Sequence, residues 1–174
     1  MKKLFAMALL ASGLMITTKA NAQNDDKSKR PSPPAIVTAK LAGGATITVD
    51  YSQPSLKGRT IGMDVEPMDG KVWRTGANEA TIFETDKDIM VMGKKLPAGK
   101  YGLFTIFDKG EVTVIFNKTW KQWGAFSYKA DDDILRVKTK VAEAKPAAEK
   151  MVFSVGAGAI GFVWGNKKVE IPVK

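Results

Sequence analysis

The sequence contains no cysteine and no histidine among its 174 residues. Disulfides, thiolate nucleophiles and imidazole bases are therefore excluded, together with Ser-His-Asp and Cys-His catalysis, the usual zinc sites and haem held by histidine. Any catalysis would have to use carboxylates, Lys, Tyr, Ser or Thr, or a metal held by oxygen ligands. The run Asp131-Asp132-Asp133 lacks the spacing, glycine and distal glutamate of a calcium loop. We identify no catalytic residues and expect no metal and no cofactor.

Long apolar runs are also scarce, and the one at the N-terminus is too short for a permanent transmembrane helix. It covers 13 residues, from Leu4 to Ile16, after two lysines, whereas a span needs about 20 residues. The small-x-small triplet Ala20-Asn21-Ala22 follows, as signal peptidase requires. The pattern predicts a signal peptide over residues 1–22, cleaved after Ala22, and a periplasmic or secreted protein without a membrane span. An uncleaved anchor or a buried helix is the alternative.

Acidic residues are fewer than basic ones. The predicted leader holds three Lys and no acid, so the 27 basic residues fall to 24 against 18 acidic residues, a net charge of +6. We expect no nucleic-acid partner, because an exported chain does not meet genomic DNA. The surplus of positive charge fits weak attraction to an anionic envelope surface or to an acidic ligand. We favour the simpler interpretation that it serves solubility alone.

The mature chain divides into a short polar segment and one domain. Residues 23–34 are polar, charged and Pro-rich and predict a disordered tether. Residues 35–174 contain no repeat and no second linker, which predicts a single domain.

Apolar and polar residues alternate with a period of two along most of this domain, as in strands with one buried face. The alternating segments are 46–51, 111–116, 134–141, 151–155, 160–164 and 169–173. One or two helical turns near 117–123 are the only helix candidate. We predict an all-β fold, an antiparallel sandwich or flattened barrel of about eight to ten strands with at most one or two short helices.

The alternation also predicts hairpin loops, because in an antiparallel hairpin the residue numbers of each opposed pair add up to the same value. Aligning the apolar faces of 37–41 and 45–49 requires a three-residue loop, Ala42-Gly43-Gly44, with a glycine in the left-handed conformation. Two further pairs follow from the same argument, Phe107 opposite Val112 and Trp164 opposite Val169.

The segment around Gly76 is the richest in polar chemistry. Arg74 has a planar guanidinium that grips carboxylates or phosphates, and Asn78 and Glu79 suit sugar hydroxyls. We expect a sharp turn at Gly76 to gather these three side chains into one cluster, with Arg74 paired to Glu79. The alternative is a purely structural turn.

A second segment, 117–128, mixes aromatic residues with Lys and Gln. Trp120, Trp123 and Tyr128 could form a stacking platform for a sugar or a flat ligand, and wall the cleft beside Arg74. Trp120 and Trp123 are three residues apart, which on a helical turn places both on one face. The alternative is a lid that plugs one end of the sandwich.

Four motifs in this order carry a family resemblance. They are Tyr51-Ser52-x-Pro54-x-x-Lys57-Gly58-Arg59, the run 72–81, Leu96-Pro97-Ala98-Gly99-x-Tyr101-x-Leu103-Phe104 and Trp123-Gly124-Ala125-Phe126-x-Tyr128. The sequence resembles the exported bacterial family known as domain of unknown function 2911, over roughly Pro34 to Val173. The resemblance implies export and the domain boundaries, and no mechanism, because the family has no established activity.

The function that these residues favour is a non-enzymatic envelope module that binds a glycan or a small anionic ligand. The first alternative is a carboxylate hydrolase resembling a glycosidase, with Glu79 as acid or base. It needs a second carboxylate across a cleft, for which Glu84 and the residues 131–133 are the candidates. The second alternative is a structural or interaction protein without a pocket.

Overall fold

The computed structural model describes residues 26–174, and this part of the chain is all β. It contains eleven strands, paired antiparallel, and two single-turn 3-10 helices, η1 (Lys27–Lys29) and η2 (Ala130–Asp132). No helix of the described residues is long and apolar enough to cross a membrane. The predicted all-β class is confirmed, with one strand more than we expected. The predicted signal peptide lies outside the described residues.

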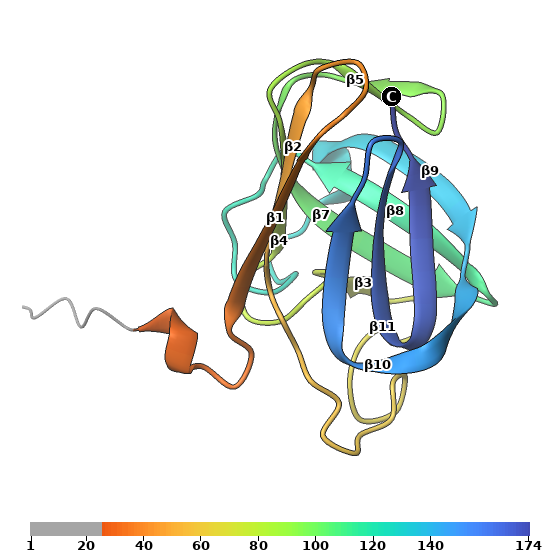
Figure 1. The fold of residues 1–174 in the computed structure, drawn as a ribbon. Helices are drawn as coiled ribbons and strands as arrows, with labels where there is room; N and C mark the ends of the chain where they lie inside the picture. The colour runs from red at the N-terminus through yellow and green to blue at the C-terminus, as the bar shows by residue number, and fades with distance from the viewer. Residues whose placement is uncertain (1–25) are drawn as a thin grey trace, which may run out of the picture.

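Seven strands form the larger sheet, in the order β1-β2-β4-β7-β8-β9, with β3 paired to β7 (Figure 1). Their bounds are β1 Pro34–Lys40, β2 Thr46–Ser52, β3 Val72–Trp73, β4 Thr81–Thr85, β7 Gly99–Asp108, β8 Glu111–Asn117 and β9 Asp133–Lys140. The sheet ends at β1 and β9, which do not pair with each other. The fold is therefore an open sandwich and not a barrel.

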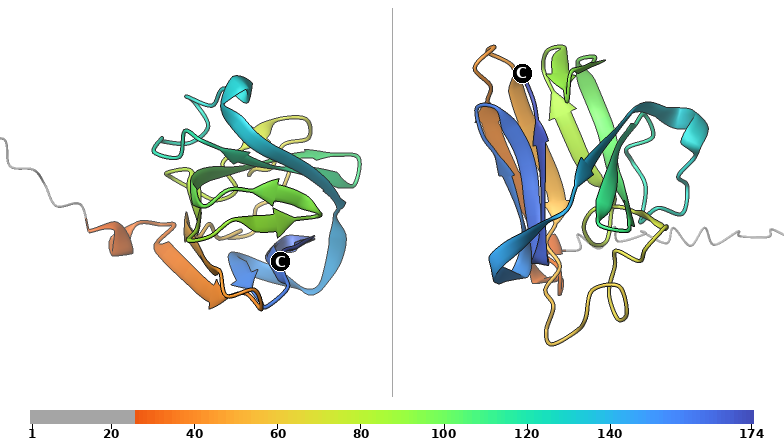
Figure 2. Two further views of the ribbon diagram at one scale, coloured as in Figure 1. Left: turned by 90° about the horizontal axis from the view of Figure 1, so that it is seen from above. Right: turned by 90° about the vertical axis from the view of Figure 1, so that its right-hand side faces the viewer.

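The second layer is a long two-stranded ribbon, β10 (Ala142–Val155) with β11 (Ala159–Pro172), which lies over one face of the larger sheet (Figure 2). A small hairpin, β5 (Ile89–Val91) with β6 (Lys94–Leu96), extends this layer. It is joined to the end of the chain by reciprocal backbone hydrogen bonds between Met90 and Lys174.

The core lies between the two layers and is built from the alternation seen in the sequence. In β2, Ile47 and Val49 are fully buried while their neighbours along the strand are only half-buried. Trp73, Phe83 and Trp164, from three different strands, are among the largest buried side chains. Each large apolar side chain removed from water contributes about 1.5–3 kcal/mol, so this layer contact accounts for most of the stability that a chain without disulfides needs.

Two predicted hairpins are confirmed. Leu41 N donates to Ala45 O at 2.7 Å around the loop 42–44, and Gly44 has a φ of +78° in the left-handed region. Phe107 lies opposite Val112.

The third hairpin, Trp164 opposite Val169, is wrong, because β11 continues through this point as one strand. Gly165, which we expected in a turn, has a φ of +57° at an irregularity opposite Ala148. A Cβ on Gly165 would lie 2.6 Å from the side chain of Ile61, so the glycine admits a neighbouring loop instead of reversing the chain.

The helical turn expected near 117–123 is also wrong, because this segment contains no helix. The Asn117 side chain explains why: its Oδ1 accepts from Thr119 N at 2.9 Å, and its Nδ2 donates to Lys129 O at 2.9 Å. These bonds hold the start and end of an irregular loop together. Trp120 and Trp123 therefore share no helical face.

Part of the expected tether contacts the domain. Arg30 makes two hydrogen bonds to Glu79, Pro33 O accepts from Gln53 N, and Ser32 O accepts from the Asn78 side chain. Arg30, Ser32 and Pro33 thus contact residues just after β2 and just before β4, beside the start of β1.

Candidate functional site

A pocket of about 480 Å³ opens at one end of the sandwich, where two loops meet the start of β1 and the middle of β11. One loop joins β2 to β3, and the other is the turn after β3. The residues that line it are Ser32, Pro54, Arg59, Asp64, Val65, Glu66, Trp73, Arg74, Gly76, Ala77, Asn78 and Trp164.

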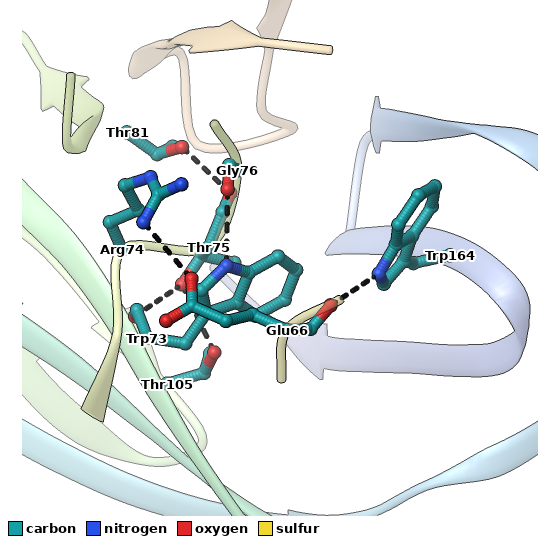
Figure 3. Close-up of polar contacts among 8 residues, drawn as sticks. All are labelled: Glu66, Trp73, Arg74, Thr75, Gly76, Thr81, Thr105 and Trp164. Atoms are coloured by element: carbon teal, nitrogen blue, oxygen red, sulfur yellow. Dashed lines mark hydrogen bonds and ion pairs between the residues drawn. The ribbon is translucent and has the colours of Figure 1, made fainter. Parts of the chain in front are cut away.

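The turn after β3 is held rigidly by buried hydroxyl and indole donors (Figure 3). Trp73 Nε1 donates to Gly76 O at 3.0 Å, and Thr81 Oγ1 donates to Thr75 O at 2.7 Å. Thr75 is fully buried and its hydroxyl lies 3.1 Å from that of Thr105 on β7. These bonds fix the turn to the sheet, so the pocket wall that it forms is preorganised.

Gly76 is required in this turn for space, and not because its backbone adopts a left-handed conformation. A Cβ at this position would lie 2.9 Å from Thr81 Oγ1 and 3.1 Å from Ser52 O. The positive φ angles are at Thr75 (+53°) and Asn78 (+58°) instead. The chain bends at these two residues, which sends successive side chains to different sides.

Arg74 points into the pocket and pairs with Glu66, not with Glu79. Its Nη1 lies 3.0 Å from Glu66 Oε2, and its Nε is buried without a hydrogen-bond partner among the described residues. Trp164 Nε1 donates to the backbone oxygen of Glu66 at 2.8 Å, as Figure 3 shows. The loop carrying the carboxylate is therefore tied to β11.

Two further side chains of opposite charge, Arg59 and Asp64, line the same pocket, each held by backbone groups. Arg59 Nε and Nη2 donate to Leu56 O and Ser55 O at 3.0 and 2.7 Å, which fixes the guanidinium at the pocket rim. Asp64 Oδ2 accepts from Thr60 N at 2.8 Å. The pocket lining thus contains two guanidinium groups and two carboxylates, and their formal charges balance.

Of the three residues predicted as one cluster, two line this pocket and one does not. Asn78 and Arg74 line it. Glu79 faces away, toward the N-terminal segment, where Arg30 Nη1 lies 3.0 Å and Lys27 Nζ 3.0 Å from its Oε1. The predicted Arg74–Glu79 ion pair is wrong, because the bend at Asn78 separates the two side chains.

Glu79 is held in its charged form. Partial burial raises the pKa of its carboxyl, but hydrogen bonds from its own backbone N–H, from Lys27 and from Arg30 outweigh burial and leave the pKa below its usual value. A general acid in a glycosidase needs the opposite shift.

The aromatic residues Trp120, Trp123 and Tyr128 do not line this pocket. Lys100 Nζ lies 5.0 Å from the centroid of the Trp120 ring, and the Arg30 guanidinium lies 5.9 Å from that of Trp123. The two indoles are thus each covered on one side by a cation.

Tyr128 belongs to the packing of the large sheet. Its ring lies 5.1 Å from that of Phe104, and its hydroxyl donates to Asp133 Oδ2 at 2.7 Å while accepting from Arg136. Burial and the bond to Asp133 raise the pKa of Tyr128 to about 12. The segment 117–128 therefore covers part of the outer face of the large sheet, and not an end of the sandwich as the lid alternative expected.

The sequence analysis assigned no site role to Arg59, Asp64, Glu66 or Trp164, all of which line the pocket. The first three lie in the long loop between β2 and β3, which shows no periodicity, and loops of this kind often carry function. The acidic residues at 64 and 66 just before Pro67 are the signal that could have drawn attention to it. Among residues 26–174, no three acidic side chains converge as metal ligands would.

Comparisons of the chain with known proteins gave one match. Neither the curated proteins nor the solved structures matched it. Residues 32–173 match a family described as "Protein of unknown function (DUF2911)", which agrees with the resemblance seen in the four sequence motifs. This chain is a member of that family.

Proposed function

We propose that the mature protein is an exported, non-enzymatic binding module of the bacterial envelope, and that its ligand is a small neutral glycan held in the pocket between Arg59, Glu66, Arg74 and Asn78. One observation carries the proposal: a preorganised pocket of about 480 Å³ in which charged hydrogen-bond donors and acceptors balance. Pockets of about 300–1,000 Å³ are typical of small-molecule sites.

The balance of charges favours a neutral polyol over an anion. A sugar hydroxyl both donates and accepts, so a ligand rich in hydroxyls can use guanidinium donors and carboxylate acceptors together. An anion would have to compete with Glu66 for Arg74 and would meet Asp64 as a like charge. The buried, unpartnered Arg74 Nε is a donor that such a ligand or a bound water can satisfy.

A hydrolase is the second candidate, with a different carboxylate pair from the one that we predicted. Glu84 pairs with Lys100 and Asp133 with Arg136, outside the pocket, whereas Asp64 and Glu66 both line it. Two carboxylates in one pocket are the minimum that glycoside hydrolysis requires. Glu66 already accepts from Arg74 at 3.0 Å, which favours a role in binding over that of a general acid.

The test is calorimetric titration of the mature chain, residues 23–174, with neutral mono- and disaccharides, amino sugars, dicarboxylates and inorganic phosphate. We expect binding of a neutral sugar, lost in Asn78→Ala and Glu66→Gln. The matched control is Glu84→Gln, which removes the ion pair between Glu84 on β4 and Lys100 on β7. This variant should bind as the wild type does. Binding of phosphate or a dicarboxylate alone, or equal effects of all three variants, would contradict the proposal.

The hydrolase alternative and the location need their own measurements. Release of nitrophenol from nitrophenyl glycosides, abolished in Asp64→Asn and Glu66→Gln, would favour the enzyme. Cell fractionation with N-terminal sequencing should find the protein in the periplasm or the medium, beginning at Gln23.

A further inference from the structure

The loop between β8 and η2, residues 118–129, exposes two large aromatic side chains; we call it the aromatic loop. Trp123 is 56% exposed and Phe126 is 87% exposed, the highest exposure of any large apolar side chain in the described residues. Both views in Figure 2 show this loop on the side of the domain opposite β10 and β11, well away from the core between the layers. Large apolar side chains that gather on a protein surface are typical of interaction sites. This loop is therefore a candidate interaction site.

The backbone holds the Phe126 ring outward. Gly124 has a φ of +60°, and a Cβ on it would lie 3.1 Å from the Phe126 ring, so glycine leaves the space in which the ring lies. The next turn is closed by Tyr128 N donating to Ala125 O at 3.2 Å. The middle of the loop is fixed as well, since Gly124 N donates to Asn78 O in the turn after β3 at 2.9 Å.

Lysines flank the two rings. Lys118, Lys121 and Lys129 are exposed, and the loop contains no acidic residue. Lys121 and Lys129 make no ion pair with any residue between 26 and 174, while Lys118 pairs with Asp132. Of the acidic residues that follow the loop, Asp132 and Asp133 are neutralised by Lys118 and Arg136, and only Asp131 remains unpaired within the described residues.

Further cations lie beside the indoles. Arg30, which pairs with Glu79, covers one side of Trp123. Lys100, which pairs with Glu84, covers one side of Trp120. A sugar stacks on an open indole face and hydrogen-bonds to polar groups around it, but here cations take one side of each indole and the most exposed ring is a phenyl without polar groups. Exposed rings flanked by Lys121 and Lys129, which are unpaired within the described part of the chain, suit a different partner.

We propose that the aromatic loop docks the protein on the surface of an anionic phospholipid bilayer, with Trp123 and Phe126 inserted at the level of the headgroups. Trp side chains are enriched at membrane interfaces, and apolar side chains flanked by lysines bind there peripherally. Lysines and arginines within a Debye length of anionic lipid are each attracted to it. The proposal is independent of the pocket, because none of these residues lines it.

The experiment is co-sedimentation of the mature chain with vesicles of phosphatidylglycerol and phosphatidylcholine (1:1) and of phosphatidylcholine alone, at low and physiological salt. We expect binding to the anionic vesicles that weakens with salt and at least tenfold weaker binding of Trp123→Ala/Phe126→Ala. Ile36→Ala is the matched control, because Ile36 is 67% exposed on β1, and should bind as the wild type does.

A second pair of variants tests the charges. Lys121→Gln and Lys129→Gln should each weaken binding to anionic vesicles about fivefold. The exposed Lys40 and Lys71, changed to Gln, should have no such effect. Equal binding to both vesicle types, no binding to either, or wild-type binding by the double aromatic variant would overturn the proposal. If the wild type binds no vesicles and the double aromatic variant loses sugar binding, the two rings belong to a glycan site instead.

Discussion

Trp164 and Glu66, 98 residues apart in the chain, are joined by a hydrogen bond of 2.8 Å from the indole Nε1 to the backbone oxygen. The indole belongs to β11 and is 1% exposed, whereas the carboxylate of Glu66 lies at the pocket surface beside Arg74. A core residue of one layer therefore positions a charged group contributed by a loop of the other. Pocket geometry and core packing are thereby coupled.

Trp164→Phe should weaken this coupling. The change leaves Glu66 O without its donor and removes part of a buried ring, which costs about 1–3 kcal/mol of unfolding free energy. Urea unfolding measures it. Trp120→Phe is the control, because Trp120 is only half-buried and its indole N–H makes no hydrogen bond to the described residues. An equal loss in both variants would show that the hydrogen bond is unimportant.

Gly76→Ala should destabilise the turn after β3 by about 1–3 kcal/mol, because the added Cβ would meet Ser52 backbone at 3.1 Å. Gly43→Ala provides the matched control, since Gly43 also lies in a turn but has nothing within 4 Å of an added Cβ. The thermal midpoint should fall for the first and stay nearly constant for the second. A similar midpoint in both variants would contradict the crowding around Gly76.

Arg74→Lys should reduce stability only slightly while affecting the pocket strongly. The side chains of Arg74 and Glu66 are 26% and 38% exposed, so their pair contributes about 1 kcal/mol. Lys keeps the charge but loses the planar fork. Urea unfolding and sugar titration on the same sample separate the two effects; a loss above about 3 kcal/mol would indicate a buried structural pair instead.

Glu79→Gln should lower stability at neutral pH and have no effect in acid. The pKa of Glu79 is lower in the folded protein than in the unfolded chain, so its contribution is complete above the unfolded pKa and is lost as the pH falls through the folded pKa. Unfolding of wild type and variant at a series of pH values from 7 downward measures this. A difference between them that does not shrink as the pH falls below the unfolded pKa would mean that the amide disturbs packing instead of charge pairing.

The sequence analysis succeeded where the decisive interactions are local. Strand alternation reflects which face of each strand is buried, and the loop 42–44 follows from a glycine in the left-handed region at Gly44. The same reasoning failed at Gly165, where the glycine makes room for Ile61 from a distant loop. Sequence spacing cannot show that a glycine is required because a residue about a hundred positions away packs against it.

The candidate site shows the same division. Arg74 and Asn78 were found because they stand close together in a polar segment, and both line the pocket. Their partners come from elsewhere: Glu66 from an irregular loop, and Ser32 from the segment expected to be a tether. A pair between charged residues far apart in sequence can be assigned only once the fold is known. The sequence analysis therefore paired Arg74 with the nearest acidic residue in its own turn.

The order of the two layers along the chain has a consequence for synthesis. All seven strands of the large sheet precede β10 and β11, which cover its apolar face. A chain that has emerged only as far as Val141 therefore presents the buried sides of β2, β4 and β8 to water. Such a surface favours aggregation, so we expect a nascent chain of this length to need a chaperone, or to stay unfolded, until the last two strands have been made.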